Sequence, residues 1–231
     1  MKLMVIGGGG REHAIIKKLK ENPAVEEIYC LPGNGGIAAD AVCVPEIGAK
    51  DIPAQVEFAK VHRIDYAVVA PDDPLALGAV DALSAAGIPC FGPKANAAII
   101  EGSKVFSKHL MKKYGIPTAD YATFDDPAKV MDYIKAKGKY PVVIKADGLA
   151  LGKGVLICEN EEQAADGVKE IMLDKKFGAS GNHVVVEEFL TGPEVSVLSF
   201  TDGKVVKPMV SSMDHKRAND HDTCLLYTSP S

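Results

Sequence analysis

A run of four glycines near the start of the chain constrains the fold more than any other feature. Leu3–Ile6 is apolar and predicts a buried strand, Gly7–Gly10 follow it, and Glu12–Lys20 has the apolar spacing of a helix. Glycines let the backbone approach a ligand closely, and the first N–H groups of the following helix attract anions. The chain is therefore expected to begin with a strand–glycine–helix unit of a parallel sheet.

The pattern continues over the first hundred residues. Further strands are predicted at Ile28–Leu31, Ala41–Val44, Tyr66–Ala70 and Ile88–Phe91, and helices at Ile52–His62 and Pro74–Ala86. This alternation predicts a Rossmann-like α/β domain with a parallel sheet, covering residues 1–102.

The second half has a different pattern of predicted secondary structure, because strands outnumber helices. Helices are predicted at Ala95–Ile100, Ser103–Tyr114, Pro127–Lys137 and Glu161–Leu173, and strands at Tyr121–Phe124, Val142–Lys145, Val155–Cys158, Val184–Phe189, Val195–Phe200 and Val205–Val210. The last two strands are separated by Thr201–Lys204, which is typical of a hairpin. We expect a separate α+β domain over residues 103–223 with some antiparallel pairing.

Composition excludes several classes of protein. The net charge of −5 gives no footprint for nucleic acid. No apolar run is long enough to cross a bilayer, and the apolar stretch before the first glycines is too short for a signal peptide. The five cysteines form no C-x-x-C pair, which favours buried thiols in a reducing compartment. A cytoplasmic protein without a membrane or nucleic-acid partner is expected.

The first glycine run has three interpretations. Gly7 and Gly9 match a dinucleotide fingerprint, but Glu12 stands where its third glycine belongs. A phosphate or phosphosugar site fits better, with Arg11 adding charge, and a simple tight turn is the third possibility.

A second glycine-rich segment, Gly148–Gly154, lies between two predicted strands. It is not a Walker A loop, because Lys153 is followed by Gly154 rather than by Ser or Thr and no helix follows. Its backbone N–H groups could cover a polyphosphate, and Lys145, at the end of the preceding strand, could contact a phosphate as a point charge. The alternative is a surface hairpin with solvated lysines.

Three further segments are weak signals when taken alone. Glu101–Lys104 could be an ordinary solvated helix start, and Glu187 and Glu188 could be exposed at a strand end or could accept hydrogen bonds from adenine and ribose. Asp214–Arg217 could be a solvated turn or could close on an anionic substrate.

Taken together, these motifs resemble the glycinamide ribonucleotide synthetase (phosphoribosylamine–glycine ligase) family of ATP-grasp enzymes. The resemblance runs from residue 1 to about residue 223 and depends on Gly7–Ala14, Pro32–Gly36, Cys90–Pro93, Glu101–Lys104, Ile144–Val155, Val186–Leu190 and Asp214–Arg217.

The resemblance implies three sets of site residues. The phosphosugar would be held by Gly8, Gly9, Gly10, Arg11, Gly33, Asn34, Gly35 and Asp72. ATP would be held by Lys104, Lys145, Gly148, Gly152, Lys153, Gly154, Glu187, Phe189 and Glu194. Catalysis would involve Lys145, Asp214, Lys216 and Arg217. Asp72 stands where the family usually has a glutamate, so its carboxylate is shorter.

The chemistry that the resemblance implies belongs to purine synthesis. The carboxylate of glycine would attack the γ-phosphate of ATP to give glycyl phosphate, and the amine of 5-phosphoribosylamine would then displace phosphate. Mg²⁺ or Mn²⁺ and lysines would offset the charge on the phosphoryl oxygens. A monomer acting on glycine, 5-phosphoribosylamine and ATP is expected.

The end of the chain departs from the family pattern. The family continues with Asp-x-Asp and a glycine-rich segment, whereas this chain has Asp220–Thr223 followed by Cys224–Ser231. We expect residues 224–231 to be a non-native tail and the carboxylates that bind metal to lie in a missing C-terminal half. The chain as given is accordingly expected to be inactive in ligation.

Two other functions remain open from the sequence. One is a different ATP-grasp carboxylate–amine ligase, and the other is a non-catalytic module that binds ATP or a phosphosugar. A nicotinamide oxidoreductase is disfavoured by the missing third glycine.

Overall fold

The computed structural model describes residues 1–149 and 154–213. By compactness the chain divides into two units, of which the first covers residues 1–188 and the second begins at Phe189.

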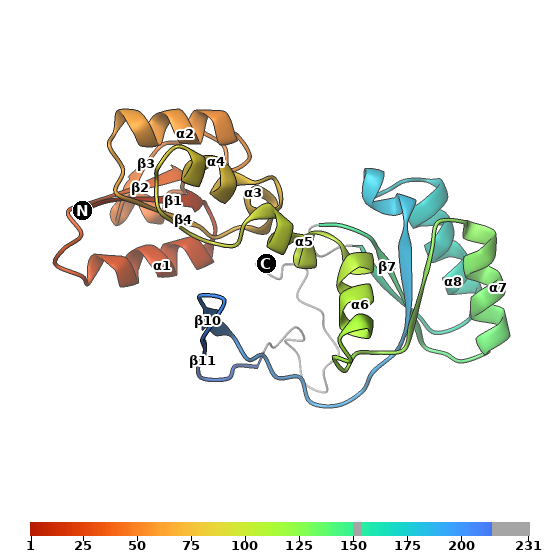
Figure 1. Cartoon of the computed structure of the whole chain (residues 1–231). Helices are drawn as coiled ribbons and strands as arrows, with labels where there is room; N and C mark the ends of the chain where they lie inside the picture. The colour runs from red at the N-terminus through yellow and green to blue at the C-terminus, as the bar shows by residue number, and fades with distance from the viewer. Residues whose placement is uncertain (150–153, 214–231) are drawn as a thin grey trace. The chain divides into compact units, whose positions relative to one another are not determined.

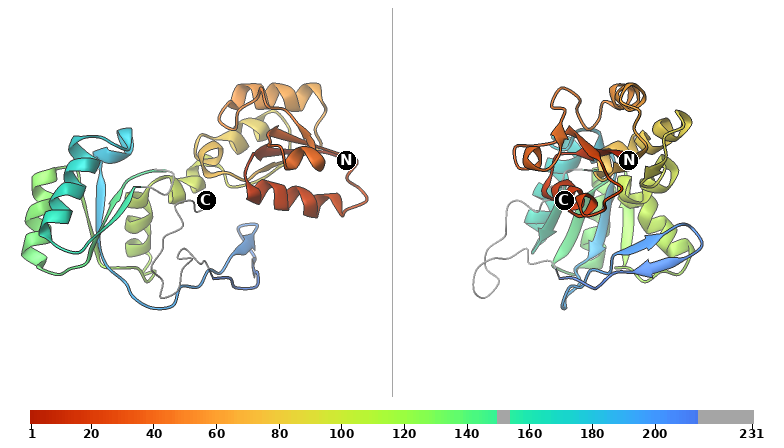
Figure 2. Two further views of the ribbon diagram at one scale, coloured as in Figure 1. Left: turned by 180° about the vertical axis from the view of Figure 1, so that it is seen from behind. Right: turned by 90° about the vertical axis from the view of Figure 1, so that its left-hand side faces the viewer.

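The chain begins with a five-stranded parallel sheet in the order β3-β2-β1-β4-β5. Its strands are β1 (Lys2–Gly7), β2 (Glu27–Pro32), β3 (Val42–Cys43), β4 (Tyr66–Val69) and β5 (Cys90–Phe91). Helix α1 (Gly10–Lys20) covers one face, and α2 (Ile52–Val61) and α4 (Ala79–Ala85) cover the other (Figures 1 and 2). The predicted parallel α/β fold is confirmed.

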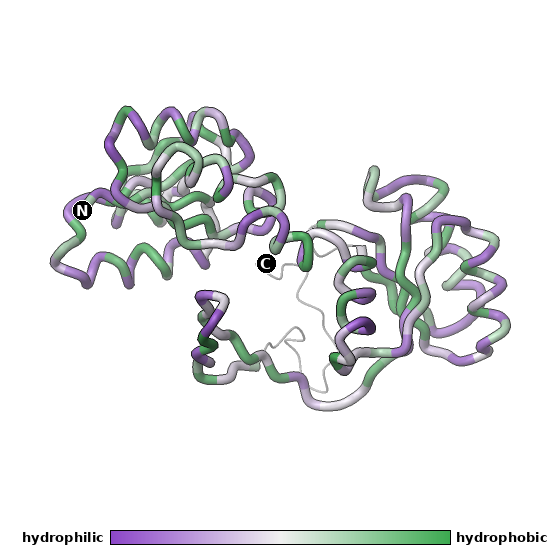
Figure 3. Tube along the Cα trace, viewed as in Figure 1, coloured by the Kyte–Doolittle hydropathy of each residue, from purple (hydrophilic) through white to green (hydrophobic). Residues whose placement is uncertain are grey.

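Both faces of this sheet are buried, which explains why its strands are apolar runs rather than alternating ones. Leu3 and Val5 pack with Ile16 of α1 in one cluster. Met4 and Ile6 point to the opposite face and belong to the cluster formed with α2 and α4. Helix α1 alternates between hydrophobic and hydrophilic residues in Figure 3, as expected for a helix with one buried face.

A second, four-stranded antiparallel sheet follows in the order β6-β9-β7-β8. Its strands are β6 (Tyr121–Phe124), β7 (Val142–Ala146), β8 (Val155–Cys158) and β9 (Val184–Glu188). Helices α7 (Pro127–Lys137) and α8 (Glu161–Val168) cover one face, and α6 (Lys104–Lys113), which follows α5 (Ala95–Gly102), lies on the other (Figure 1).

The register of β7 and β9 decides which side chains meet. Lys145 pairs with Val185 and Val143 pairs with Glu187, so Lys145 and Glu187 are diagonal neighbours on one face. Ile144 points to the other face, where it joins the core under α7 and α8. The charged pair therefore lies on the face that α6 covers.

Two predicted helices differ from those observed. The segment predicted as one helix over Pro74–Ala86 is two, α3 (Asp72–Ala76) and α4, because Gly78 adopts φ +87° between them. The helix predicted over Glu161–Leu173 ends as α8 at Val168 and continues as a π-helical turn, η2 (Lys169–Leu173). Short 3₁₀ turns occur at η1 (Ile37–Ala39) and η3 (Gly178–Asn182).

The second unit contains the predicted hairpin. Strands β10 (Ser199–Thr201) and β11 (Val206–Pro208) pair antiparallel, which confirms the hairpin signal at Thr201–Lys204. Both strands are shorter than predicted.

Among the helices of the described residues, none has the length and apolar character required to span a bilayer.

Candidate functional site

Three loops meet at the carboxyl edge of the parallel sheet, where the loops after β1, β2 and β4 converge. Gly33 N donates to Gly7 O over 3.1 Å. A Cβ atom added to Gly8 would lie 2.7 Å from Gly33 O, and one added to Gly7 would lie 2.8 Å from Pro71 Cγ. The glycines therefore permit a close approach of the three loops, and they bring together segments that the sequence predicted as one phosphosugar site.

Asn34 fastens two of these loops to each other. Its Nδ2 donates to Gly8 O over 2.7 Å, and its Oδ1 accepts from Gly36 N at 2.8 Å and Ile37 N at 2.9 Å. All these partners are backbone groups, so Asn34 holds together the Gly7–Gly10 and Gly33–Gly36 loops, which we call the cradle. A direct contact with a ligand stays a prediction.

Glu12 closes the cradle from the helix side. Its side chain is buried, and Oε2 accepts the N–H of Gly9. A Cβ atom on Gly7 would lie 2.7 Å from Glu12 Cγ, so the glutamate fills the space beside the first glycine. A carboxylate is stabilised by the positive end of α1, but it occupies the position where a dinucleotide fingerprint has its third glycine.

The remaining predicted members of this site differ in their exposure. Cβ atoms added to Gly10 and Gly35 would meet nothing within 4 Å, and Arg11 is exposed. Asp72 is half-buried in the first turn of α3, next to Asp73, which pairs with Lys50 at 2.5 Å. A ligand can therefore approach Gly10 and Gly35 without displacing side chains.

A cluster of buried charges lies on the antiparallel sheet. Lys145 Nζ of β7 lies 2.8 Å from Glu187 Oε2 of β9, and Lys108 Nζ of α6 lies 3.2 Å from Glu187 Oε1. The side chains of Lys108 and Glu187 are 8% and 6% exposed, whereas that of Lys145 is 28% exposed. Lys145 is thus the member of the cluster that a ligand can reach most easily.

The segment Glu101–Lys104 packs against the beginning of the second glycine loop. Ser103 caps α6 by accepting from Phe106 N at 3.1 Å. Asp147 accepts from Ser103 Oγ and from Val105 N, both at 3.1 Å, and Lys104 Nζ donates to Gly148 O over 2.7 Å.

Lys104 is half-buried, and its electrostatic surroundings are mixed. Burial lowers the pKa of its ammonium, while Asp147 and Glu101 act in the opposite direction. Lys145 also lowers and Glu187 also raises the pKa of Lys104, so these three charges act on one another. The two lysines predicted to contact phosphates therefore share one electrostatic environment.

The two described ends of the second glycine loop make close contacts with neighbouring residues. Gly148 adopts φ +92°, and a Cβ atom there would lie 2.7 Å from Ser180 Oγ, so glycine is required. Gly154 is buried, and its carbonyl accepts from Ala146 N at 2.8 Å. Gly152 and Lys153 lie outside the described residues, as do Asp214, Lys216 and Arg217.

Two predicted ATP residues belong to the second compact unit. Phe189 is 36% exposed and Glu194 is exposed. Their predicted contacts with the nucleotide stay predictions.

Sequence reasoning missed two residues in this part of the molecule, Lys108 and Asp147. Lys108 follows Lys104 by four positions, so it lies on the same side of α6, and this spacing was a usable signal. Asp147 stands two residues after Lys145, but its role in capping α6 depends on a tertiary contact.

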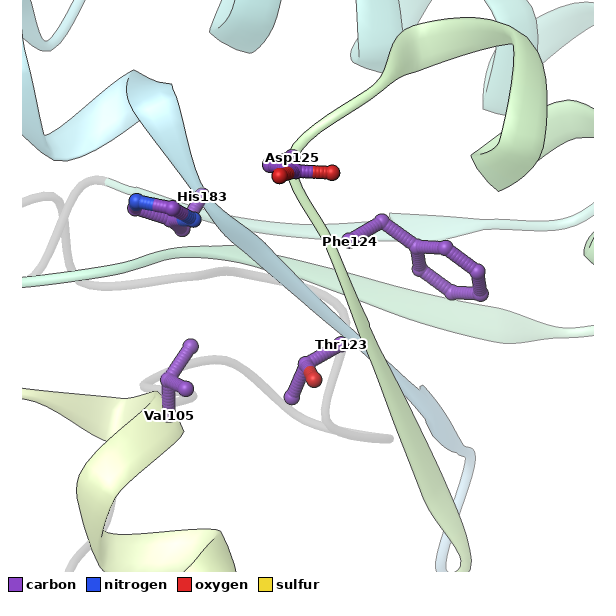
Figure 4. Close-up of a pocket in the computed structure, with 5 residues that line it drawn as sticks. All are labelled: Val105, Thr123, Phe124, Asp125 and His183. Carbon is purple, nitrogen blue, oxygen red and sulfur yellow. The ribbon is translucent and has the colours of Figure 1, made fainter.

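A small cavity of about 200 Å³ lies between α6 and the antiparallel sheet. It is lined by Val105, Thr123, Phe124, Asp125 and His183. Figure 4 shows its lining coming from α6, from the end of β6 and from the residue before β9. Neither Lys145 nor Glu187 lines it, so it is separate from the charged cluster.

The four described cysteines are free thiols. Burial raises the pKa of the Cys30 thiol to about 12 and also raises the pKa of Cys90 and Cys158. These thiols are poor nucleophiles at neutral pH.

A parallel α/β unit followed by an antiparallel sheet with lysines beside a glycine loop defines the ATP-grasp class of fold, and the comparisons agree. The chain matches the family model "Phosphoribosylglycinamide synthetase, N domain" over residues 1–101 and the model "Phosphoribosylglycinamide synthetase, ATP-grasp (A) domain" over residues 102–227. The chain therefore belongs to the phosphoribosylglycinamide synthetase family, and the resemblance seen in the sequence is confirmed.

Individual relatives support this assignment. The chain is 50% identical over 222 residues to a phosphoribosylamine–glycine ligase of Listeria monocytogenes, covering 96% of this chain and 53% of the relative. It is 46% identical over 224 residues to that of Vibrio cholerae, covering 96% and 52%. The chain thus spans about half the length of the curated relatives that it matches.

Solved structures agree with the fold. The crystal structure of phosphoribosylamine–glycine ligase from Thermotoga maritima matches with a TM-score of 0.79 and 32% identity, covering 96% of this chain and 52% of the other. A biotin carboxylase–ATP complex from Campylobacter jejuni matches with a TM-score of 0.71 at 16% identity, covering 90% and 49%, which supports the fold alone.

Proposed function

We propose that the protein ligates glycine to 5-phosphoribosylamine at the expense of ATP, giving glycinamide ribonucleotide, ADP and phosphate in purine synthesis. The observation that carries this proposal is the contact between the Gly7–Gly10 and Gly33–Gly36 loops, in a chain that also has Lys145 beside its second glycine loop. Membership of the family supports the choice of substrates.

The proposed division of labour follows the two sheets. Residues 1–102 would form the phosphosugar domain, and residues 103–223 would belong to the ATP-grasp domain. The backbone N–H groups around Gly8–Arg11 and Gly33–Gly35 would hold the sugar phosphate, with Asp72 nearby. Gly10 and Gly35 present the open side of this cradle.

ATP would bind over the antiparallel sheet. Lys104 and Lys145 would contact its phosphates, and the Gly148–Gly154 loop would cover them. Glu187, the backbone near Phe189, and Glu194 would hold adenine and ribose. Asp214, Lys216 and Arg217 would lie beside the reacting groups.

The chemistry consists of positioning and charge stabilisation. The carboxylate of glycine attacks the γ-phosphorus, ADP leaves, and the amine of 5-phosphoribosylamine attacks the acyl carbon and releases phosphate. Lys145 offsets charge on the transferring phosphoryl group, and no protein nucleophile is required.

A divalent cation is expected from the family. In residues 1–149 and 154–213, no group of three His, Cys, Asp or Glu side chains could hold a metal ion. No step is therefore assigned to a metal held by the described residues.

A reducing cytoplasm and a monomeric state complete the proposal. The free thiols of the described cysteines support the reducing compartment. Sedimentation of the purified protein tests the monomer.

The direct test is ligation by the full-length protein. ADP release from ATP should require both glycine and 5-phosphoribosylamine, and glycinamide ribonucleotide should accumulate in equal amount. ADP release that is indifferent to glycine, or that follows another amino acid, would refute the proposed substrates.

A further inference from the structure

Lys108 is the most deeply buried cation of the described residues, and the proposed function gives it no task. Its Nζ lies 3.2 Å from Glu187 Oε1, donates to Thr118 Oγ1 over 2.6 Å, and lies 5.4 Å from the centre of the Tyr121 ring. The ammonium is thus held on several sides by protein groups. A buried ammonium held in this way is expected to act through its ion-pair partner, Glu187.

Lys145 contrasts with Lys108 in its surroundings. Lys145 forms an ion pair with Glu187 Oε2 at 2.8 Å. Its side chain is 28% exposed, against 8% for Lys108. Glu187 therefore lies between one enclosed lysine and one accessible lysine. The enclosed lysine is fixed, while the accessible one can turn toward a ligand.

The charges of this cluster explain what Lys108 contributes. Two ammonium groups and one carboxylate sum to +1, so the cluster keeps one positive charge in excess. Without Lys108, the carboxylate of Glu187 would neutralise Lys145 completely. Without Lys108, a movement of Lys145 toward a ligand would also leave the buried carboxylate of Glu187 without either of these two lysines, which is costly in a low-dielectric site.

We propose that Lys108 is a positioning residue for the ATP phosphates. Its ammonium neutralises the carboxylate of Glu187 and so leaves the charge of Lys145 available to the polyphosphate of an adenine nucleotide. This inference rests on the ATP site of the proposed function. It assigns Lys108 no contact with the nucleotide, because its ammonium is enclosed by Glu187, Thr118 and Tyr121.

The inference is tested by a charge series on this chain. Lys108→Met brings the cluster to 0, Glu187→Gln brings it to +2, and the double variant restores +1. Calorimetry gives the Kd of ATP, and competition with ATP gives the Kd of adenosine. The ratio of the two isolates the phosphates, because lost contacts with adenine affect both ligands.

The ratio should follow the net charge. Lys108→Met should reduce the preference for ATP over adenosine about tenfold, Glu187→Gln should raise it, and the double variant should return to the preference of the unaltered chain. Lys108→Arg keeps the charge and should stay within about twofold of the unaltered chain. If Lys108→Met does not fold, Glu187→Gln and the double variant still give the two remaining charges.

Two results would overturn the inference. A ratio that is the same in all variants would show that Lys108 has only a structural role. A double variant as weak for ATP as Lys108→Met would show that Lys108 contacts the phosphates itself. Both differ from a failure of the proposed function, in which the unaltered chain would not bind ATP at all.

Discussion

The two glycine-rich segments prepare for phosphate in different ways. The cradle of Gly7–Gly10 is built from backbone: its loop touches the Gly33 loop, and the side chains that support it, Asn34 and Glu12, bond to backbone groups. The second segment starts at Gly148, whose carbonyl accepts from Lys104, and the strand before it carries Lys145, which pairs with the buried Glu187. Phosphate binding is expected to depend on backbone shape at Gly7–Gly10 and on side-chain charge at the second segment, which we also call a cradle.

This difference has a physical reason. A single phosphate at a helix N-terminus can be held by a few fixed N–H groups. A polyphosphate that must give up a phosphoryl group carries more charge, and the charge is redistributed during transfer, so mobile ammonium groups are suited to it. Substitutions in the two segments should accordingly fail in different ways.

The largest effect is expected at Lys145. Lys145→Ala in the full-length protein should lower kcat/KM for ATP roughly a hundredfold, because a charged contact to the phosphates is lost. Steady-state kinetics with ATP varied would measure it. Lys169→Ala, which removes an exposed lysine of η2, is the matched control and should change little. An unchanged kcat/KM for Lys145→Ala would sink its assignment.

The next effect is expected at Gly8. Gly8→Ala places a Cβ atom 2.7 Å from Gly33 O, so the two loops must separate. The free energy of unfolding should fall by about 2 kcal/mol, and ribose 5-phosphate should bind more weakly. Denaturant unfolding of both variants tests this against Gly10→Ala, whose Cβ meets nothing within 4 Å and should be tolerated. Equal losses in the two variants would contradict the close approach.

Asn34→Ala should have a smaller effect. One of its three hydrogen bonds joins two exposed loops and the other two lie within its own turn, so we expect a loss of about 1 kcal/mol in the free energy of unfolding. Asn34→Asp keeps the acceptor for Gly36 N and Ile37 N but loses the donor to Gly8 O, and should lie between. If Asn34→Ala is as stable as the unaltered chain, the side chain does not fasten the loops.

The smallest effect concerns pH. A hydrogen bond from His13, and to a smaller extent one from Lys20, lowers the pKa of Asp40 to about 2. Because the folded value is below the ordinary one, the stabilisation is present above about pH 4 and is lost as the pH falls toward 2. Asp40→Asn should therefore show a smaller decrease in Tm across this range. Asp132→Asn, at an exposed position of α7, should keep the decrease of the unaltered chain.

The sequence predicted the sheets well because buried parallel strands are apolar runs and glycines mark their ends. It could not predict the break at Gly78, since the glycine there could also have stayed within a helix. The pair of Lys145 and Glu187 depends on the register of β7 and β9, which joins strands about forty residues apart. A charged residue such as Lys108 on an amphipathic helix looks solvated until the sheet beneath it is known.

The central claim is that the two cradles take different ligands. Backbone amide NMR of this chain tests it without any substitution. Ribose 5-phosphate should shift the amides of Gly9, Gly10 and Gly35 and leave Ala146–Gly148 unchanged, whereas ATP should shift Ala146–Gly148 and leave the first set unchanged. Shifts of both sets by one ligand, or of the Gly9 and Gly10 amides by ATP alone, would contradict the claim.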